Sequence, residues 1–417
     1  MHNTEVVSVD EARALVLAHS YQTSYEYIRL EESLGRVLFS TQTSPEAVPP
    51  FATSLMDGFA LASKDAQNVS KSSPLSLGVV GHIGAGMVFD GSLRAGQCVR
   101  IMTGCALPEG TDSVIKLEDT AISTGTGGKG SVISYGYPIK PGQFVKAKGA
   151  EVEVGDVLVE GGQVIDAHCI GALSSLGFSE ISVFQKPKVA IIPLGSELVE
   201  TSHTPKMGQI RNSNRYTLSA LAQKAGAEVI PFDIIPDDRG AIAETILRAT
   251  ELADIVVTSG GSAGGDFDFI DYVIKDLGEL LYTDVLMNPA KTQGFGIVKG
   301  VPVFGLPGQP TAAMMAFEVL VRPAIRKCGG FAKIYRTRVD ARLDCPVKYG
   351  RRTNHLPHYQ YAHAYYDGQM NLWVKPLRQG GSLYNALDGV NGFVLMPPSE
   401  DELQISQLID FYSFVIM

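Results

Sequence analysis

The chain has 417 residues, which at about 150 residues per domain is enough for roughly three domains. Hydrophobic residues make up 45% of it and charged residues 19%, so it can bury sizeable cores, and disorder is excluded as its main state. The net charge is −9, which argues against nucleic acid or an anionic membrane as a partner, because both attract proteins with a surplus of Lys and Arg.

Up to residue 186 the pattern predicts short elements and one small β-domain. Ser8–Glu11 has the form of a capping box and precedes apolar residues at helical spacing, which predicts a helix from about Asp10 to Ala18. Residues 41–54 are rich in Pro, Ser and Thr and are interpreted as a linker or extended arm. Between Leu55 and Lys140, short apolar runs separated by glycine are typical of a β-domain. A helix over Asp166–Leu176, closed by a glycine, and the strand ISVF follow.

Residues 187–330 alternate between strand and helix patterns. The predicted strands are 189–193, 228–235, 254–258, 280–287, 295–298 and 301–305. The predicted helices are one capped by Asn214 and ended by Gly226, followed by 240–249, 268–277 and 310–327. Such alternation predicts a doubly wound parallel sheet with helices on both faces. Residues 331–417 return to short alternating runs, so the predicted fold class is α/β plus β, in several domains.

The sequence shows no sign of export or membrane insertion. No cationic segment precedes an apolar one at the N-terminus, so a signal peptide is not expected. The most apolar stretch, Thr311–Ile325, contains Glu318 and Arg322 and is too short and too charged to span a bilayer. The five cysteines are scattered and form no CxxC pair, which is typical of a reduced protein without a zinc finger. We therefore expect a soluble, cytoplasmic protein.

The predicted sheet indicates where a ligand would bind. In an open α/β sheet the ligand crevice lies at the carboxyl ends of the strands. This rule selects five loops of the chain: Leu194–Glu197, Gln209–Asn214, Ser259–Asp268, Asn288–Thr292 and Pro307–Thr311.

The loop with the sequence SGGSAGGDFD carries the clearest signal among these five. Its four glycines let backbone N–H groups converge on an anion, and the helix that follows adds the positive end of its dipole. Asp266 and Asp268 at the helix start would suit a divalent cation such as Mg²⁺ beside bound phosphate. The alternative is a tight turn in which Asp268 only caps the helix. Glu197 and Lys291 lie in two other loops, where each is either a functional charge or an ordinary surface residue.

Two other motifs are not assigned a function. Ser123–Gly130, with the sequence STGTGGKG, resembles a phosphate-binding loop but lacks the required spacing and the strand-to-helix context, so we interpret it as the tip of a hairpin. His355, His358 and His363 form a histidine-rich patch without a partnering Cys or acidic residue, and we do not interpret it as a metal site.

Five strings, taken together and in this order, resemble one protein family. They are PPF with SLMDGFA in Pro49–Ala60, IMTG with LPEGTD in Ile101–Asp112, GQIRNSNR in Gly208–Arg215, SGG at Ser259–Gly261, and GLPGQP in Gly305–Pro310. These strings resemble the signatures of the molybdopterin molybdenumtransferases, or molybdenum insertases, which include the E-domain of gephyrin.

The resemblance implies a fold of four parts in an elongated homodimer. These parts are an extended domain (1–54 and 141–186), an inserted small β-domain (55–140), an α/β domain of the molybdopterin-binding type (187–330) and a C-terminal β-barrel (331–417). It also implies that the insert reaches the α/β crevice of the partner subunit, and it makes molybdopterin adenylyltransferase a candidate partner.

The resemblance further implies a reaction and a set of site residues. Molybdate is inserted into adenylylated molybdopterin in the presence of Mg²⁺, and AMP is released. The matching catalytic positions are Asp57, Thr103, Glu197, Asp268 and Lys291. Of these, Glu197 and Asp268 would hold the metal. The positions that would bind the molybdopterin nucleotide are Ser259, Gly260, Gly261, Ser262, Gly264, Gly265, Asn212, Ser213, Asn214, Pro307 and Gly308.

Several loops depart from the family pattern. Asn288, Ala290 and Thr292 stand where the family has Lys, Gly and Pro, and Ser196 and Asn212 each stand in place of Asp. Charge-assisted hydrogen bonds are worth about 1.5–3 kcal/mol each, so their loss could slow a reaction strongly. The sequence therefore leaves a second hypothesis, a catalytically impaired paralogue that carries molybdopterin or the finished cofactor or acts as a scaffold. A third is a variant selective for tungstate.

Overall fold

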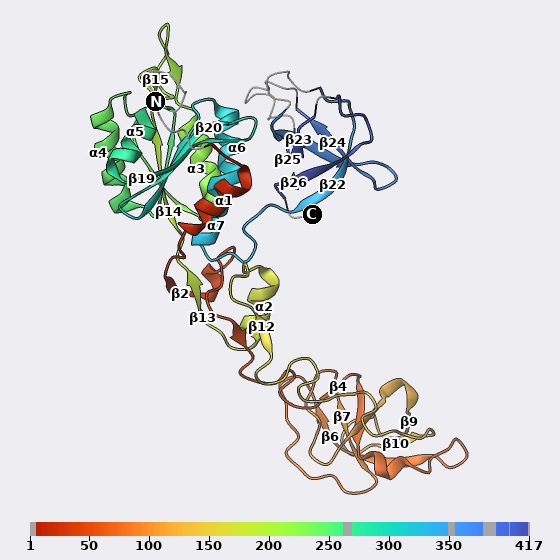
Figure 1. Cartoon of the computed structure of the whole chain (residues 1–417). Helices are drawn as coiled ribbons and strands as arrows, with labels where there is room; N and C mark the ends of the chain where they lie inside the picture. Colours follow the sequence, from red (N-terminus) through yellow and green to blue (C-terminus); the bar gives the residue numbers. More distant parts are fainter. Residues whose placement is uncertain (1–5, 262–268, 349–354, 378–388, 400, 416–417) are drawn as a thin grey trace. The chain divides into compact units, whose positions relative to one another are not determined.

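The computed structural model describes residues 6–261, 269–348, 355–377, 389–399 and 401–415. The chain forms two compact units (Figure 1). One comprises Met1–Ser40, Gly161–Ala167 and Glu180–Met417, and the other comprises Thr41–Glu160 and His168–Ser179. The second unit is therefore inserted into the first, and it contains the predicted β-domain.

A six-stranded sheet is the centre of the inserted unit, with the order β8-β5-β7-β6-β10-β9. Its strands are β5 (Gly58–Leu61), β6 (Leu75–Ile83), β7 (Gln97–Ile101), β8 (Ser113–Lys116), β9 (Ala121–Thr124) and β10 (Val132–Tyr135). Both faces of the sheet are buried at β5, since Phe59 and Leu61 enter one apolar cluster while Ala60 enters another. The glycine-rich stretch Ser123–Gly130 covers the end of β9 and the turn into β10, which confirms the predicted hairpin tip.

Short elements precede and follow this sheet in the sequence. Strand β4 (Thr53–Ser54) pairs with β11 (Val145–Lys146), and β3 (Gln42–Thr43) pairs with β12 (Val157–Val159), so the predicted linker 41–54 contains two short strands. Helix α2 (Ala167–Ser175) confirms the predicted helix over 166–176. Its chain reverses at Gly177, which has a φ of +81°. In the first unit, β13 (Glu180–Phe184) pairs with β2 (Tyr25–Arg29).

The first unit is built on a seven-stranded sheet with the order β1-β19-β20-β21-β18-β14-β17. Its strands are β1 (Val6–Val7), β14 (Lys188–Pro193), β17 (Glu228–Pro231), β18 (Ile255–Ser259), β19 (Glu279–Val285), β20 (Thr292–Val298) and β21 (Val301–Leu306). Every strand except β20 runs in the same direction. Strand β20 is antiparallel because only Lys299 and Gly300, both with positive φ, separate it from β21, and a two-residue turn joins antiparallel strands.

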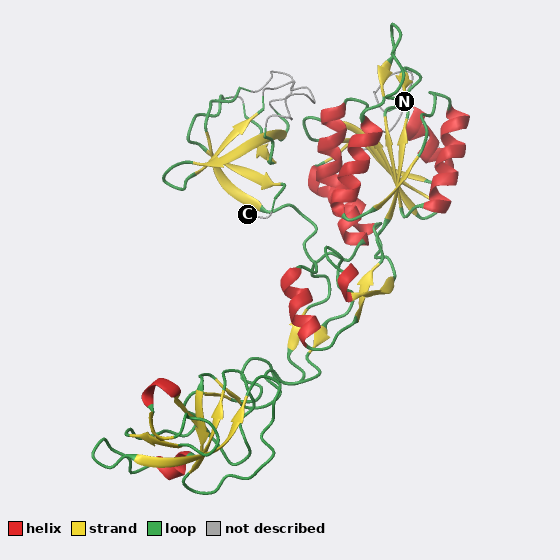
Figure 2. Ribbon diagram, turned by 180° about the vertical axis from the view of Figure 1, so that it is seen from behind, coloured by secondary structure: helices red, strands yellow, loops and turns green. Residues whose placement is uncertain are grey.

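Helices cover both faces of this sheet, as the alternation predicts (Figure 2). The helices are α1 (Val9–Ala18), α3 (Asn214–Ala225), α4 (Arg239–Leu252), α5 (Phe269–Leu277), α6 (Pro310–Ala316) and α7 (Arg322–Cys328). Residues of α1, α3, α6 and α7 share one apolar cluster with the sheet, and those of α4 and α5 share a second. The predicted capping box at the start of α1 is present, since Ser8 and Glu11 bond each other's backbone N–H groups.

Besides the antiparallel β20, which departs from the predicted parallel sheet, two predicted details of this unit are wrong. The strand predicted over 228–235 ends at Pro231, and Ile235 forms only an isolated bridge with Leu194. Asn214 does not cap α3 but is its first residue. The side chain that accepts from the first turn is Asn212, whose Oδ1 lies 3.2 Å from the backbone N of Arg215. Asn214 is therefore free to use its amide elsewhere.

The long helix predicted over 310–327 is present with a π-helical turn, Phe317–Val321, between α6 and α7. Pro323 lacks an N–H group and so leaves a carbonyl of the preceding turn without its helical donor. That carbonyl belongs to Val319, and Arg13 Nε donates to it over 3.3 Å.

The two charges that interrupt this apolar stretch, Glu318 and Arg322, are buried. Glu318 accepts two hydrogen bonds of 3.0 Å from Arg336, and Arg322 lies beside it.

The C-terminal β-domain of the first unit is a closed barrel. Its strands are β22 (Arg338–Leu343), β23 (His358–Tyr366), β24 (Leu372–Pro376), β25 (Gly392–Met396) and β26 (Leu408–Ser413). The predicted β-pattern after residue 331 is thus confirmed. Across the described ranges of the chain, none of the helices combines the length and the apolar character needed to cross a membrane.

Candidate functional site

Backbone hydrogen bonds tie several of the predicted loops together at the carboxyl edge of the seven-stranded sheet. The Leu194 N–H donates to the Ser259 carbonyl over 2.9 Å, and the Gly260 N–H donates to the Leu306 carbonyl over 3.0 Å. Asn214 Nδ2 donates to the Gly308 carbonyl over 2.9 Å. The structure therefore brings four of the five predicted loops into mutual contact.

Gly260 is required by this close approach. Its φ is +97°, and a Cβ at this position would lie 2.2 Å from the Leu194 carbonyl oxygen. Only glycine accommodates both the left-handed backbone and the neighbouring carbonyl. The first glycine of SGG thus has a packing reason as well as the anion-binding reason that the sequence indicates.

Two buried polar atoms at this edge, Ser259 Oγ and Asn212 Nδ2, have no hydrogen-bond partner among the residues that the structure describes. Ser259 is 3% and Asn212 is 1% exposed. The amide orientation of Asn212 is set by its Oδ1, which accepts from the Arg215 N–H. A buried polar group without a hydrogen bond costs about 1–3 kcal/mol of folding free energy. The presence of two such groups in the candidate loops therefore requires an explanation.

Glu197 lies in the loop after β14 and is exposed. Its carboxylate folds back over Gly195. A Cβ on that glycine would lie only 2.6 Å from Glu197 Oε2. The neighbouring Ser196 exchanges two hydrogen bonds with Asp237: its N–H donates to Asp237 Oδ2 over 2.9 Å, and its hydroxyl accepts from the Asp237 N–H over 3.0 Å. The substitution at 196 therefore ties this loop to the one after β17.

Asp237 is a site neighbour that the sequence analysis did not identify. It follows the strand predicted over 228–235, so the rule that selected five loops also applies to its loop. The five loops selected from the sequence nevertheless left it out. The signal was present in the sequence, because Asp237 comes two residues after the predicted end of that strand.

Lys291 lies in the loop between β19 and β20 and is exposed. Its backbone carbonyl accepts from the Val285 N–H over 2.8 Å. Ala290 has a φ of +69°, a conformation that disfavours alanine, and its carbonyl accepts from Gln293 Nε2 over 2.5 Å. This loop follows β19, which runs parallel to β1 and in the same direction as β18, so it lies at the same edge of the sheet as the other four.

Asp57 and Thr103 are brought together in the inserted unit. Asp57 directly precedes β5, and Thr103 lies two residues after the end of β7; the two strands pair with Gly58 opposite Ile101. The Thr103 N–H and hydroxyl both donate to Asp57 Oδ1, over 2.7 and 2.8 Å. These bonds, the backbone one first, lower the pKa of Asp57 below its usual value. Asp57 is therefore an exposed, ionised carboxylate with a fixed orientation.

The remaining predicted positions divide into two groups. Ser213, Gly261 and Pro307 lie in the loops already described, and Ser213 is the residue before α3. Ser262, Gly264, Gly265 and Asp268, together with Asp266, lie outside the described residues. Among the residues described, no group of three or more His, Cys, Asp or Glu side chains could hold a metal ion.

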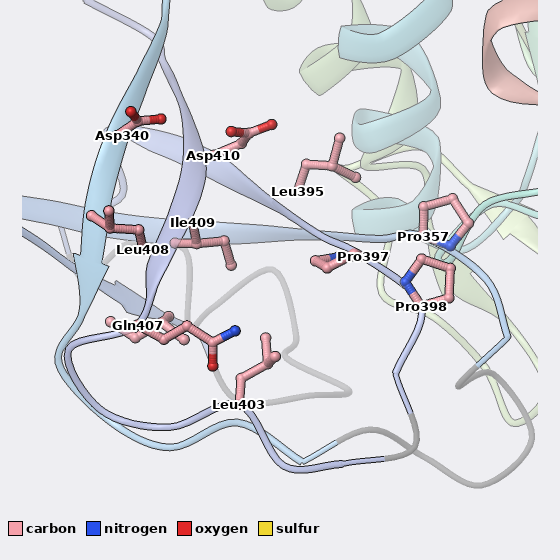
Figure 3. A pocket seen from close by; sticks show the side chains of 11 residues that line it. Asp340, Pro357, Leu395, Pro397, Pro398, Leu403, Gln407, Leu408, Ile409 and Asp410 are labelled. Atoms are coloured by element: carbon pink, nitrogen blue, oxygen red, sulfur yellow. The ribbon is translucent and has the colours of Figure 1, made fainter.

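The barrel has a hollow of its own, with a volume of about 510 Å³ (Figure 3). Leu395, Pro397 and Pro398 line it, and the carboxylates of Asp340 and Asp410 lie near one another above it. None of the predicted site residues lines this hollow, so it is not part of the candidate site.

Comparison with known sequences decides the family. Residues 7–177 match the MoeA N-terminal region (domain I and II), and residues 190–327 match the probable molybdopterin binding domain. A molybdopterin molybdenumtransferase of Haemophilus influenzae is 30% identical over 414 residues, which cover 98% of this chain and 99% of that protein. The chain belongs to the molybdopterin molybdenumtransferase family.

Other members of the molybdopterin molybdenumtransferase family agree in sequence and in structure. The enzyme of Staphylococcus aureus (strain COL) is 35% identical over 317 residues, covering 76% of this chain and 74% of the relative. The crystal structure of a molybdopterin biosynthesis MoeA protein from Pyrococcus horikoshii superposes with a TM-score of 0.86 at 30% identity, covering 99% of this chain and all of that one. The C-terminal barrel, which follows both matched domains, is thus part of the shared architecture.

Proposed function

We propose that this chain inserts molybdate into adenylylated molybdopterin and releases AMP in a Mg²⁺-dependent reaction. The observation that carries the proposal is the convergence of Leu194, Ser259, Leu306 and Asn214 at one edge of the sheet, which assembles family motifs that lie far apart in the sequence. The place of the family in molybdenum cofactor biosynthesis supports the same conclusion.

The crevice would bind the nucleotide through backbone and amide groups. The loop that begins at Ser259 leads towards helix α5, where N–H groups and the helix dipole favour phosphate. Bound substrate, or water held with it, would supply partners for Ser259 Oγ and Asn212 Nδ2, and a small shift of the loop would expose them. Lys291 would balance phosphate charge from the loop after β19.

The predicted metal ligands, Glu197 and Asp268, would offer Mg²⁺ two carboxylates rather than a complete set of protein ligands. Glu197 offers an exposed carboxylate, a hard oxygen donor of the kind that Mg²⁺ prefers, and Asp268 would supply the second. Mg²⁺ is commonly bound by one or two carboxylates together with water and substrate phosphates, so a site with few protein ligands suits it. When bound, the ion would neutralise phosphate charge during AMP release.

The inserted unit would act through Asp57 and Thr103. Thr103 holds Asp57 ionised and oriented, so that this carboxylate can accept a proton or a hydrogen bond from the substrate. The proposed active form is a homodimer, in which this unit faces the crevice of the partner subunit. Molybdopterin adenylyltransferase, which makes the adenylylated substrate, is the proposed transient partner.

Single-turnover chemistry tests the proposal. Purified protein, adenylylated molybdopterin, molybdate and Mg²⁺ are mixed, and AMP and protein-bound molybdenum are followed together. We expect AMP to appear only with molybdate and Mg²⁺, and molybdenum to be retained in equal amount. Tight binding of the nucleotide without AMP would contradict the proposal and identify a carrier or scaffold. A rate that is higher with tungstate would change the assigned oxyanion.

A further inference from the structure

His358, one of the three histidines singled out in the sequence, is buried at the start of β23 and contacts the loop that carries Lys291. Its Nδ1 lies 3.1 Å from Asn288 Nδ2. The backbones also pair: the Asn288 N–H donates to the Pro357 carbonyl over 3.0 Å, and the Tyr359 N–H donates to the Asn288 carbonyl over 2.7 Å. Three hydrogen bonds thus fasten Asn288 to the barrel, next to Pro357 at the rim of the hollow in Figure 3.

The same loop is held from inside the α/β domain. Gln293, which is 1% exposed, donates to the Ala290 carbonyl, and the Lys291 carbonyl accepts from Val285. Ala290 stands where the family has glycine and keeps a positive φ, a conformation that persists in alanine only when its surroundings impose it. Met287 belongs to the same buried apolar cluster as Tyr359 of the barrel. The loop is therefore clamped between the sheet and the barrel.

We propose that Asn288 and His358 form a latch that positions Lys291 by fastening its loop to the C-terminal barrel. Both are positioning residues. Position 288 carries asparagine where the family pattern has lysine, so in this chain it supplies a hydrogen bond to the barrel in place of a positive charge. The catalytic consequence rests on the proposed function, whereas the latch itself is a property of the loop.

The chemistry of the pair suits a neutral anchor. An asparagine amide donates to the imidazole nitrogen without bringing a charge into a buried contact. A lysine at 288 would place an ammonium group against the buried imidazole, where desolvation disfavours it. The latch therefore makes an unusual prediction: Asn288→Lys, which restores the family residue, should loosen the loop and weaken activity.

Backbone hydrogen exchange of the full-length protein tests the latch directly. In His358→Ala and Asn288→Ala, exchange of residues 286–293 should rise about tenfold, the factor expected for one lost hydrogen bond. His358→Gln retains an amide acceptor and should restore slow exchange. The matched control is His363→Ala, on the same strand, whose imidazole instead contacts the Gly389 carbonyl over 2.6 Å. It should leave residues 286–293 unchanged.

Steady-state kinetics separates positioning from general stability. In His358→Ala, KM for adenylylated molybdopterin should rise about tenfold, with a smaller change in kcat, because Lys291 acts on bound phosphate. In a Lys291→Ala background the same substitution should have no further effect, since coupled residues are not additive.

The outcomes are distinguishable. Unchanged exchange in His358→Ala would overturn the latch, whatever the activity. Faster exchange with unchanged KM, or with effects that add to those of Lys291→Ala, would overturn the positioning role. If the wild-type protein releases no AMP, the proposed function fails, and the exchange data alone then support or overturn the latch.

Discussion

The crevice of the α/β domain and the Asp57–Thr103 pair of the inserted unit hold their polar groups in opposite ways. Asp57 accepts two short hydrogen bonds from a single neighbour and is exposed, so its local geometry is complete without a ligand. In the crevice, Ser259 Oγ and Asn212 Nδ2 are buried and find no partner within the described part of the chain. The carboxylate of Asp57 is thus already hydrogen-bonded before substrate binds. In the crevice, the two buried polar atoms lower the stability of the free protein, and a bound substrate can remove this cost by bonding to them.

This difference follows from how each site is assembled. Asp57 and Thr103 are placed by two paired strands, so strand register alone determines their contact. The crevice instead joins loops from β14, β18, β21 and α3, and each contact depends on several elements being in place. The first arrangement should resist local changes, and the second should be sensitive to them.

The largest expected effect comes from breaking the crevice backbone. Gly260→Ala places a Cβ 2.2 Å from the Leu194 carbonyl at a positive φ, so we expect destabilisation of about 3 kcal/mol or more. Urea unfolding followed by circular dichroism measures it. Gly368→Ala is the matched control, because open space surrounds that glycine and its stability should change little. A wild-type unfolding midpoint for Gly260→Ala would contradict the described packing.

The inserted unit is tested by removing one charge. Asp57→Asn keeps the size and an acceptor for Thr103, so the protein should stay as stable as wild type while AMP release falls about 100-fold. The single-turnover assay measures this loss. Asp119→Asn, an exposed carboxylate of the same unit, should retain full activity. Equal rates for the two variants would remove Asp57 from the proposed site.

The pH dependence sharpens this point. Because the folded-state pKa of Asp57 is lowered, the ionised form persists to lower pH, and its contribution is lost only as pH falls through that lowered pKa. Thr103→Val removes the hydroxyl donor but keeps the backbone one, so the pKa of Asp57 should rise part of the way to its usual value. We expect the acid limb of the rate profile to move to higher pH, and carboxyl NMR titration provides the direct check. An unmoved acid limb would show that another group controls it.

Removing the Ser259 hydroxyl of the crevice should have a smaller effect and should raise stability, whereas Gly260→Ala lowers it. Ser259→Ala removes a buried hydroxyl that bonds to none of the described residues, so the free protein should gain about 1 kcal/mol of stability while its affinity for adenylylated molybdopterin falls. Thr258→Val is the matched control in the same strand. Its hydroxyl donates to the Phe304 carbonyl over 3.2 Å, so this change should destabilise. Calorimetric unfolding and titration measure both quantities, and a loss of stability in Ser259→Ala would contradict the comparison.

The smallest effect is expected at Ser196. Restoring the family residue with Ser196→Asp would put a second carboxylate beside Asp237, so stability should fall by about 0.5 kcal/mol and recover in high salt. Adding Asp237→Asn should also remove the penalty. Unfolding at two ionic strengths measures the difference, and a gain in stability for the single variant would show that the two loops separate.

Local pattern was informative where the responsible contacts are local. The capping box of α1, the glycine that closes α2 and the hairpin tip at Ser123–Gly130 each depend on a few adjacent residues, and all three were predicted. The ends and directions of the strands were harder to predict from the sequence. The antiparallel direction of β20 depends on a turn between two apolar runs, and the end of β17 depends on its neighbours in the sheet.

The sequence by itself determined the family and the alternation of strands and helices, and it selected the loops of the candidate site, because motifs and periodicity are properties of neighbouring positions. Only the tertiary structure decided how the substituted residues are used. Ser196 exchanges hydrogen bonds with Asp237, Asn212 accepts from the first turn of α3, and Asn288 is bonded to His358. The partners at 196 and 288 lie in other loops or in the barrel, so chain folding, which brings distant segments into hydrogen-bond contact, gives these substitutions their roles.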